Sequence, residues 1–318
     1  MRSAEPGPNA GSRGEIMEQN NLSRTGLAPT RGERKAIANL EIVPRRHLGR
    51  WVTAAVIAVL LAWVIKAFAE GDIAWGVVAE FFAAPAILFG LVNTVVMTIC
   101  AMSLGIALGV VFAVMYMSPN PVIRVVAWGY IWLFRGTPLI LQLLLWFNLA
   151  LVFPTLGIPG LIEVRTVEFM TPFVATLLGL GLNQGAYTAE VMRSGILSVD
   201  SGQTEAAKSI GMTRLLTLRR IVLPQAMRVI IPPVGNEVIS MVKLTSIASV
   251  IQYAEILRNA QTIYYANARV IELLIVAAGW YLIVVTLLQI GQYQLERSFA
   301  KGQTHRGNHK PGRAVENA

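Results

Sequence analysis

Charged residues are scarce in this sequence. They make up 14% of its 318 residues, whereas hydrophobic residues make up 54%. Soluble domains usually carry about a quarter charged residues, so this deficit and several long apolar runs indicate a membrane protein. The single cysteine, Cys100, lies inside an apolar run and excludes a disulfide framework within the chain. The three histidines fall in the polar ends, and we expect no bound metal because no clustered metal ligands occur in the apolar part.

A nucleotide-binding loop is also missing. No Gly-x-x-x-x-Gly-Lys-Ser/Thr motif occurs, so we do not expect this chain to hold ATP phosphates itself. The net charge of +9 does not indicate nucleic acid, because the basic residues concentrate in both tails and in one central loop. These segments are alternate connections of a polytopic protein, which is the positive-inside pattern. We therefore expect membrane lipid, and no nucleic acid, as the partner of this charge.

Long apolar runs predict an all-α, polytopic membrane protein with about six transmembrane helices. The polar residues 1–50 are predicted to form a disordered cytoplasmic tail, followed by a first span over residues 51–68. The other five spans fall within residues 87–296, and residues 297–318 form a basic cytoplasmic tail. Both ends are thus predicted to lie in the cytoplasm, in a bacterial inner membrane.

Prolines interrupt two of the predicted spans. Arg135-Gly-Thr-Pro138 breaks one apolar run, and Arg135 is interpreted as an anchor at a helix end or, alternatively, as a structural charge beside a pathway. Pro232 and Pro233 lie in the middle of another run, where two consecutive backbone donors are lost. This pair predicts a discontinuous helix whose second half presents free N–H groups to the membrane interior.

A polar, basic stretch over residues 200–226 separates two apolar regions and predicts a short helix. Asp200 or Ser201 can cap its start, and Gly211 can end it in a left-handed conformation. Ala206 and Ala207 then fall on one small face that another protein can approach closely. An ordinary amphipathic loop helix is the alternative interpretation.

The motif Glu205-Ala-Ala207, followed by Gly211 and by Ile221-x-Leu-Pro224, resembles the EAA loop of permease subunits in binding-protein-dependent ABC importers. Three further motifs are similar to the polar amino acid branch of that family: Arg135-Gly-Thr-Pro-Leu139, Ala186-Tyr-Thr-Ala-Glu190 and Lys243-Leu-Thr-Ser-Ile247. The resemblance covers about residues 87–296. It implies the type I ABC importer permease fold, with a cytoplasmic coupling loop over residues 198–220.

In that family the coupling helix docks into an ABC ATPase subunit, a role that the resemblance gives to Glu205, Ala206, Ala207 and Gly211. It implies four kinds of partner: an ATPase dimer, a second permease subunit of the same or a related chain, an extracytoplasmic solute-binding protein and membrane lipid. The chain would bind no cofactor and would not itself be an enzyme, because ATP and Mg are used by the ATPase. The alternative is an ion-gradient-driven secondary transporter of a small zwitterionic solute.

An amino acid substrate needs a partner for its ammonium and donors for its carboxylate. Glu237 is the lead candidate for the ammonium, because charged side chains in spans are rare and often functional. A structural ion pair with Lys243 is the alternative for Glu237. Thr245 and Ser246, with the amides after the proline pair, are the candidates for the carboxylate.

Asn183 and Glu190 complete the predicted substrate pathway, since their spacing places them on one helical face with Tyr187. A helix-end position at the water boundary is the alternative interpretation of Glu190.

Overall fold

The structure is a computed structural model that describes residues 48–158 and 162–300. The predicted disordered tail therefore lies outside the described residues, except for its last three positions, as does most of the basic C-terminal tail. The chain divides into two units, Met1–Gly71 and Asp72–Ala318. The first unit contains helix α3 (Leu48–Glu70), which is apolar and exposed along its length. In its last turn Lys66 and Glu70 form an ion pair at 3.7 Å.

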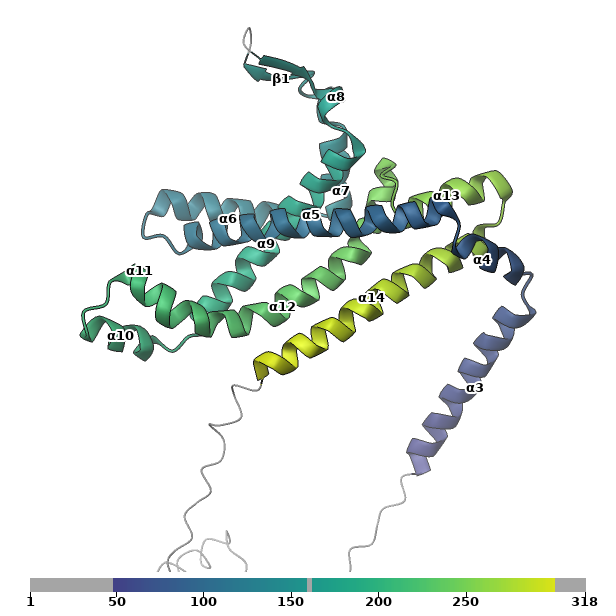
Figure 1. Cartoon of the computed structure of the whole chain (residues 1–318), viewed down its shortest axis with the longest axis horizontal. Helices are drawn as coiled ribbons and strands as arrows, with labels where there is room; N and C mark the ends of the chain where they lie inside the picture. Colours follow the sequence, from purple (N-terminus) through teal and green to yellow (C-terminus); the bar gives the residue numbers. More distant parts are fainter. Residues whose placement is uncertain (1–47, 159–161, 301–318) are drawn as a thin grey trace, which may run out of the picture. The chain divides into compact units, whose positions relative to one another are not determined.

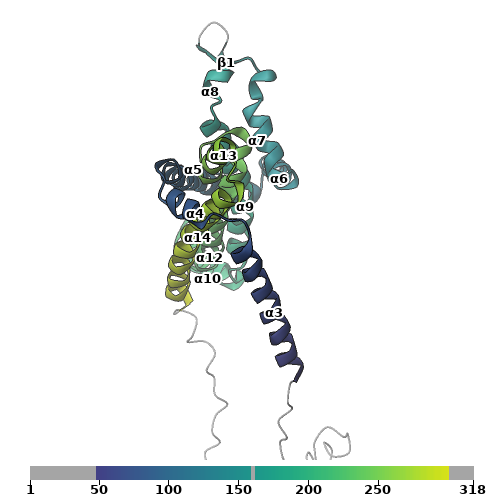
Figure 2. The ribbon, with the colours of Figure 1, turned by 90° about the vertical axis from the view of Figure 1, so that its right-hand side faces the viewer.

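The second unit is almost entirely helical (Figures 1 and 2). Its long helices are α5 (Pro85–Tyr116), α6 (Pro121–Gly136), α9 (Pro172–Leu197), α12 (Leu223–Leu244) and α14 (Val270–Ala300). Shorter elements connect them: α4 (Trp75–Phe82), α7 (Leu139–Phe147), η1 (Leu149–Leu151), α8 (Thr166–Phe169), α10 (Ser201–Ser209), α11 (Arg214–Thr217), η2 (Leu218–Val222), η3 (Thr245–Ile251) and α13 (Ile256–Asn267). Proline at the first helical position starts α5, α6 and α9, where its missing N–H costs no hydrogen bond.

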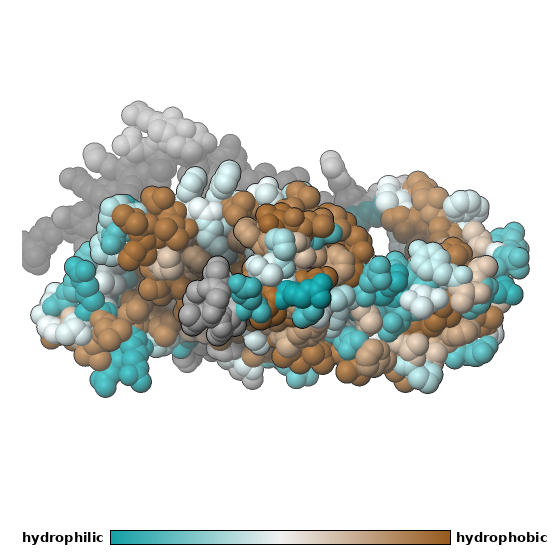
Figure 3. All heavy atoms as spheres, turned by 90° about the horizontal axis from the view of Figure 1, so that it is seen from above, coloured by the Kyte–Doolittle hydropathy of each residue, from teal (hydrophilic) through white to brown (hydrophobic). Residues whose placement is uncertain are grey.

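Among the described residues, four helices are long and apolar enough to cross a membrane, and five if the bent pair α6 and α7 forms one span. The four are α3, α5, the run from Arg214 to Ile251, and α14. The remaining predicted span corresponds to α9, which has 26 residues. Its mean hydropathy is too low for it to count among the apolar helices, because its buried faces carry polar side chains. Hydrophobic residues cover much of the surface seen in Figure 3, as expected for helices that face lipid.

Helix α9 occupies the centre of the unit, with its longest contact along α5. Gly105 and Gly109 of α5 make this contact close, because a Cβ at either position would lie 2.6 Å from the side chain of Gln184 or Thr188. The main core lies between α5, α7, α9 and α12 and includes the buried side chains of Met97, Leu143 and Met241. The packing thus fixes which polar groups of α9 face its neighbours.

The predicted break at Pro138 is confirmed. Helices α6 and α7 meet at an angle of 102°, and the buried amides of two residues bond to the groups that the break exposes. Gln142 Nε2 donates to the Phe134 carbonyl at 3.0 Å and to the Thr137 carbonyl at 3.1 Å. Asn183 Nδ2, from α9, donates to the same Phe134 carbonyl at 2.7 Å. Protein groups therefore satisfy the irregular backbone, as a lipid environment requires.

The predicted break at Pro232 and Pro233 was wrong, because α12 runs through both prolines without interruption. Each proline removes only one backbone N–H donor, and packing against the neighbouring helix α14 stabilises this segment of α12. Gln292 of α14 donates to the Pro232 carbonyl at 2.9 Å, and it comes this close because Gly235 has no Cβ. No half-helix therefore begins after Pro233, and the predicted free amides for a carboxylate are absent from this position.

Two features between the spans were not predicted. Strands β1 (Thr155–Ile158) and β2 (Ile162–Arg165) pair antiparallel as a hairpin in the connection between α7 and α9. Helix α13 begins at the buried Glu255, whose carboxylate accepts from the backbone N–H groups of Leu257 and Arg258 and from the Tyr281 hydroxyl. The Glu255 cap thereby ties α13 to α14.

Candidate functional site

Helix α10 forms where the sequence predicts it. The Asp200 side chain accepts from Gly202 N at 2.7 Å and caps the first turn. Gly211 ends the helix with φ +77°, and Met212 N then donates to the Ala207 carbonyl at 3.0 Å, the bonding of a Schellman motif. These local signals explain why a short polar segment holds one defined conformation.

The two alanines of α10 do not share one open face. Ala207 is buried against the following elements of its own chain, α11 and η2, whereas Ala206 is exposed. Ile210, at the end of α10, is 78% exposed, and Leu215 of α11 is 75% exposed, so large apolar side chains are exposed close to Ala206 in the sequence. Glu205 is exposed as well. Exposed apolar side chains of this size on a polar loop are typical of a docking surface.

Glu237 of α12 lies against two polar residues of α9. Gln184 Nε2 donates to Glu237 Oε2 at 2.7 Å, and Thr188 Oγ1 donates to the same oxygen at 3.0 Å. Oε1 of Glu237 accepts no hydrogen bond from the described residues. One carboxylate oxygen is therefore held by α9, and the half-buried side chain keeps its second oxygen unpaired within the part of the chain that the structure describes.

The alternative interpretation of Glu237 is contradicted, because no ion pair joins it to Lys243 within residues 48–158 and 162–300. Lys243 lies six residues after Glu237 in α12, and its side chain is exposed. The hydroxyls of Thr245 and Ser246 donate back to the carbonyls of Val242 and Lys243, both at 2.7 Å. Their hydrogens are thus used within the helix end and are not directed at a ligand.

Asn183 and Glu190 lie apart from the Glu237 cluster. Asn183 is buried at the bend between α6 and α7, where its amide supports the backbone, so its position has a structural explanation. Glu190 forms an ion pair with Arg193 one turn later, with Arg193 Nε 3.1 Å from Oε2. The sequence prediction missed the partners of Glu237, although the i, i+4 spacing of Gln184 and Thr188 places them on one face of α9.

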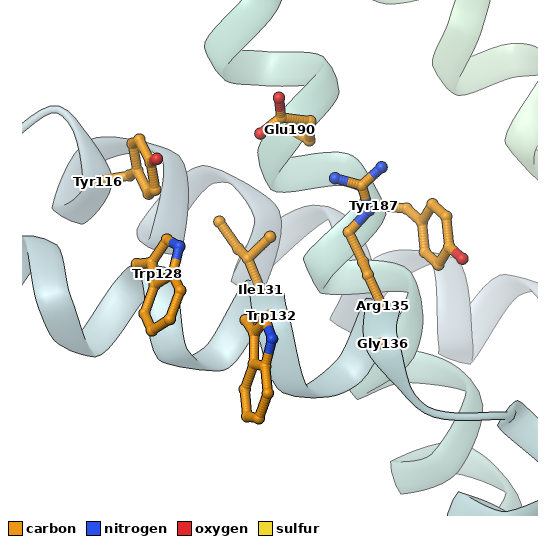
Figure 4. A pocket seen from close by; sticks show the side chains of 8 residues that line it. All are labelled: Tyr116, Trp128, Ile131, Trp132, Arg135, Gly136, Tyr187 and Glu190. Atoms are coloured by element: carbon orange, nitrogen blue, oxygen red, sulfur yellow. The ribbon is translucent and has the colours of Figure 1, made fainter.

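A separate open cavity of about 450 Å³ lies between α6 and α9 (Figure 4). Its lining includes Trp128, Trp132 and Arg135 of α6, Tyr187 and Glu190 of α9, and Tyr116 at the end of α5. The guanidinium of Arg135 lies over the Tyr187 ring, 5.1 Å from its centre.

Comparisons with known proteins identify relatives along most of the chain. The family described as "Binding-protein-dependent transport system inner membrane component" matches residues 105–301. The "Arginine transport system permease protein ArgU" of Corynebacterium glutamicum is 43% identical over 83% of this chain and 84% of its own length. The "L-cystine transport system permease protein TcyB" of Bacillus subtilis is 38% identical over 71% of this chain and 91% of its own length.

A solved structure agrees with these relatives. The structure titled "Crystal structure of an amino acid ABC transporter with histidines" matches with a TM-score of 0.61 and 36% identity, over 69% of this chain and 97% of that chain. The fold prediction is confirmed by this match, and the ion-gradient-driven alternative finds no support among the relatives. The chain therefore belongs to the binding-protein-dependent transport system inner membrane components, and it is a multi-pass permease subunit of an ABC importer.

Proposed function

We propose that this permease translocates a polar amino acid inward after an extracytoplasmic solute-binding protein delivers it. The names of the relatives above refer to arginine, L-cystine and amino acids, which supports this substrate class. A separate ABC ATPase dimer supplies the energy, and a second permease subunit, the same chain or a related one, completes the pathway. The chain binds no cofactor of its own, and ATP and Mg are used by the ATPase.

The observation that carries the proposal is the asymmetry of the Glu237 carboxylate. Gln184 and Thr188 hold Oε2 in place, while Oε1 accepts no hydrogen bond from the described residues. A fixed carboxylate inside a span suits the ammonium group that every amino acid carries, because a charge-assisted hydrogen bond is strong where water is partly excluded. Lys243, exposed nearby on α12, stays a candidate on the same pathway.

We further propose that α10 is the coupling helix and lies on the cytoplasmic side. Its open face is formed by Ala206 and Ile210, beside Glu205, while the buried Ala207 anchors it to its own chain. Gly211 ends the helix and turns the chain into α11. A rigid, capped helix with an exposed apolar tip is well suited to receive a push from a partner protein.

The test is to express the chain with its ATPase and measure two quantities, co-purification of the ATPase and ATP-dependent uptake of a labelled amino acid. Ile210→Asp places a charge in the proposed contact and should abolish both. Ile210→Val keeps an apolar side chain and should preserve both, which separates docking from folding.

Two results would contradict the proposal. One is wild-type uptake by a complex that contains a catalytically inactive ATPase. The other is undiminished co-purification of the ATPase with the Ile210→Asp variant.

A further inference from the structure

The two donors that hold the Glu237 carboxylate are also bonded to each other. Gln184 Nε2 donates to Thr188 Oγ1 at 3.0 Å and to Glu237 Oε2 at 2.7 Å. Thr188 Oγ1 donates to the same carboxylate oxygen at 3.0 Å. The three side chains form a closed triangle of hydrogen bonds, so a movement of any one of them breaks two bonds. A network of this kind holds a carboxylate in one orientation.

Burial separates the roles of the three side chains. Thr188 is 0% exposed and Gln184 is 5% exposed, whereas Glu237 is half-buried. A ligand that reaches this cluster therefore meets the carboxylate, and the two residues of α9 influence it only through the oxygen that they hold. This arrangement distinguishes a ligand-binding group from the groups that orient it.

Helix α5 restricts the two donors in turn. A Cβ at Gly105 would lie 2.6 Å from Cγ of Gln184, and a Cβ at Gly109 would lie 2.6 Å from Cγ2 of Thr188. The backbone of α5 thus packs directly against both side chains. A closely packed interior leaves no empty space into which they could turn, so their rotamers are fixed before any ligand binds.

We propose that Gln184 and Thr188 are positioning residues for the substrate, which orient Glu237 so that its Oε1 meets the ammonium group of the amino acid. This inference rests on the proposed role of Glu237 as the substrate ligand. Without its anchors the Glu237 side chain turns about torsions that each have three staggered positions. Only transporters with the correct orientation then bind substrate, and the apparent affinity falls by the fraction that is correctly oriented.

The test is ATP-dependent uptake by the complete transporter in proteoliposomes. Radiolabelled polar amino acids are screened first, and the one that the wild type takes up fastest serves as the probe. Thr188→Val and Gln184→Met each keep an apolar side chain of similar size and leave Oε2 with one donor. Each should raise KM about threefold, and the double variant about tenfold, with the maximal rate unchanged, because one or two torsions of Glu237 become free.

Two variants separate positioning from packing. Thr188→Ser keeps the hydroxyl and should retain a KM close to that of the wild type. Thr176→Val makes the same change as Thr188→Val on the same helix, where the buried hydroxyl donates to the Pro172 carbonyl at 2.6 Å, and it should leave KM unchanged. The amount of assembled transporter is measured for each variant, so that a loss of folded protein is not counted as a change in KM.

A double-mutant cycle determines whether the donors act through Glu237. In the Glu237→Gln background, Thr188→Val should not raise KM further, because the charge that Thr188 positions is already absent. A full threefold rise in that background would overturn the inference, as would a wild-type KM in the Gln184→Met, Thr188→Val double variant or an equal rise with Thr176→Val. Failure of the proposed function is distinct: Glu237→Gln alone would then transport with the wild-type KM, or the wild type would take up no labelled amino acid.

Discussion

Replacing Glu237 by glutamine removes the charge proposed to bind the substrate and leaves the local packing in place. The new amide is close in size to the carboxylate. Its carbonyl oxygen can still accept from Gln184 Nε2 and Thr188 Oγ1, which lie 2.7 and 3.0 Å from Oε2 in the wild-type protein. The helix contacts between α9 and α12 should therefore persist, and expression and complex assembly should be unchanged.

The cost to transport follows from the lost charge. A hydrogen bond to a charged group contributes about 1.5–3 kcal/mol, so the apparent KM for uptake should rise by roughly 10- to 150-fold. The assay measures uptake of a labelled amino acid into proteoliposomes that contain the complete transporter and are loaded with ATP. At a substrate concentration near the wild-type KM, uptake should fall to roughly a fifth of the wild-type rate or less.

Glu237→Asp is the matched control. It keeps the charge and moves it back by one methylene, so it should restore part of the uptake that glutamine abolishes. Wild-type KM and rate in the Glu237→Gln transporter would remove Glu237 from the pathway, and so would equal losses in the Gln and Asp variants, since these would indicate packing rather than charge.

Three further predictions address the other features. Gly211→Val forces a left-handed φ of +77° on a branched residue at a cost of about 1–2 kcal/mol and should uncouple ATP hydrolysis from uptake, whereas Gly211→Asn, which tolerates this conformation, should not. Gly109→Ala places a Cβ 2.6 Å from Thr188 and should lower the melting temperature measured by tryptophan fluorescence, whereas Gly129→Ala, with open space around it, should not. Burial raises the pKa of Glu255 from 4.5 to about 7, so its contribution to stability is present below pH 4.5 and lost as pH rises through 7; Glu255→Gln should flatten that decline in melting temperature.

Local sequence signals predicted the elements that depend on neighbouring residues. Asp200 and Gly211 define α10 because a cap and a left-handed glycine act within one or two turns. The bend at Pro138 was predicted for a similar reason, since the glycine and proline that cause it lie two residues apart in the chain. Apolar runs likewise located the spans, including the one that α9 occupies, although α9 is too polar to meet the hydropathy criterion for a membrane span.

Features that depend on distant residues were not predictable in this way. Pro232 and Pro233 predicted a break in the helix, because no nearby residue indicates that Gln292, 60 residues from Pro232, donates a hydrogen bond to the Pro232 carbonyl. Asn183 read as a pathway residue, although the carbonyl it satisfies lies 49 residues earlier in the chain. Ala207 is buried by elements that follow it, a contact that helical periodicity cannot specify.

The continuity of α12 changes how coupling is expected to work. From Arg214 to Ile251 the chain is helical without interruption, so α11, η2 and α12 lead as one element from the end of the proposed coupling helix α10 to Glu237. The distance from Arg214 to Glu237 is about 35 Å along the helix axis. A discontinuous helix would absorb a displacement of α10 at a hinge beside the prolines, but an uninterrupted one moves Glu237 relative to Gln184 and Thr188 on α9. The π-helical turn η2, the one irregular segment in this path within the described residues, then becomes the place where bending can occur. A displacement at Ile210 would in this way change the hydrogen bonds that hold the Glu237 carboxylate, so a single helical run would link the proposed ATPase contact to the proposed substrate site.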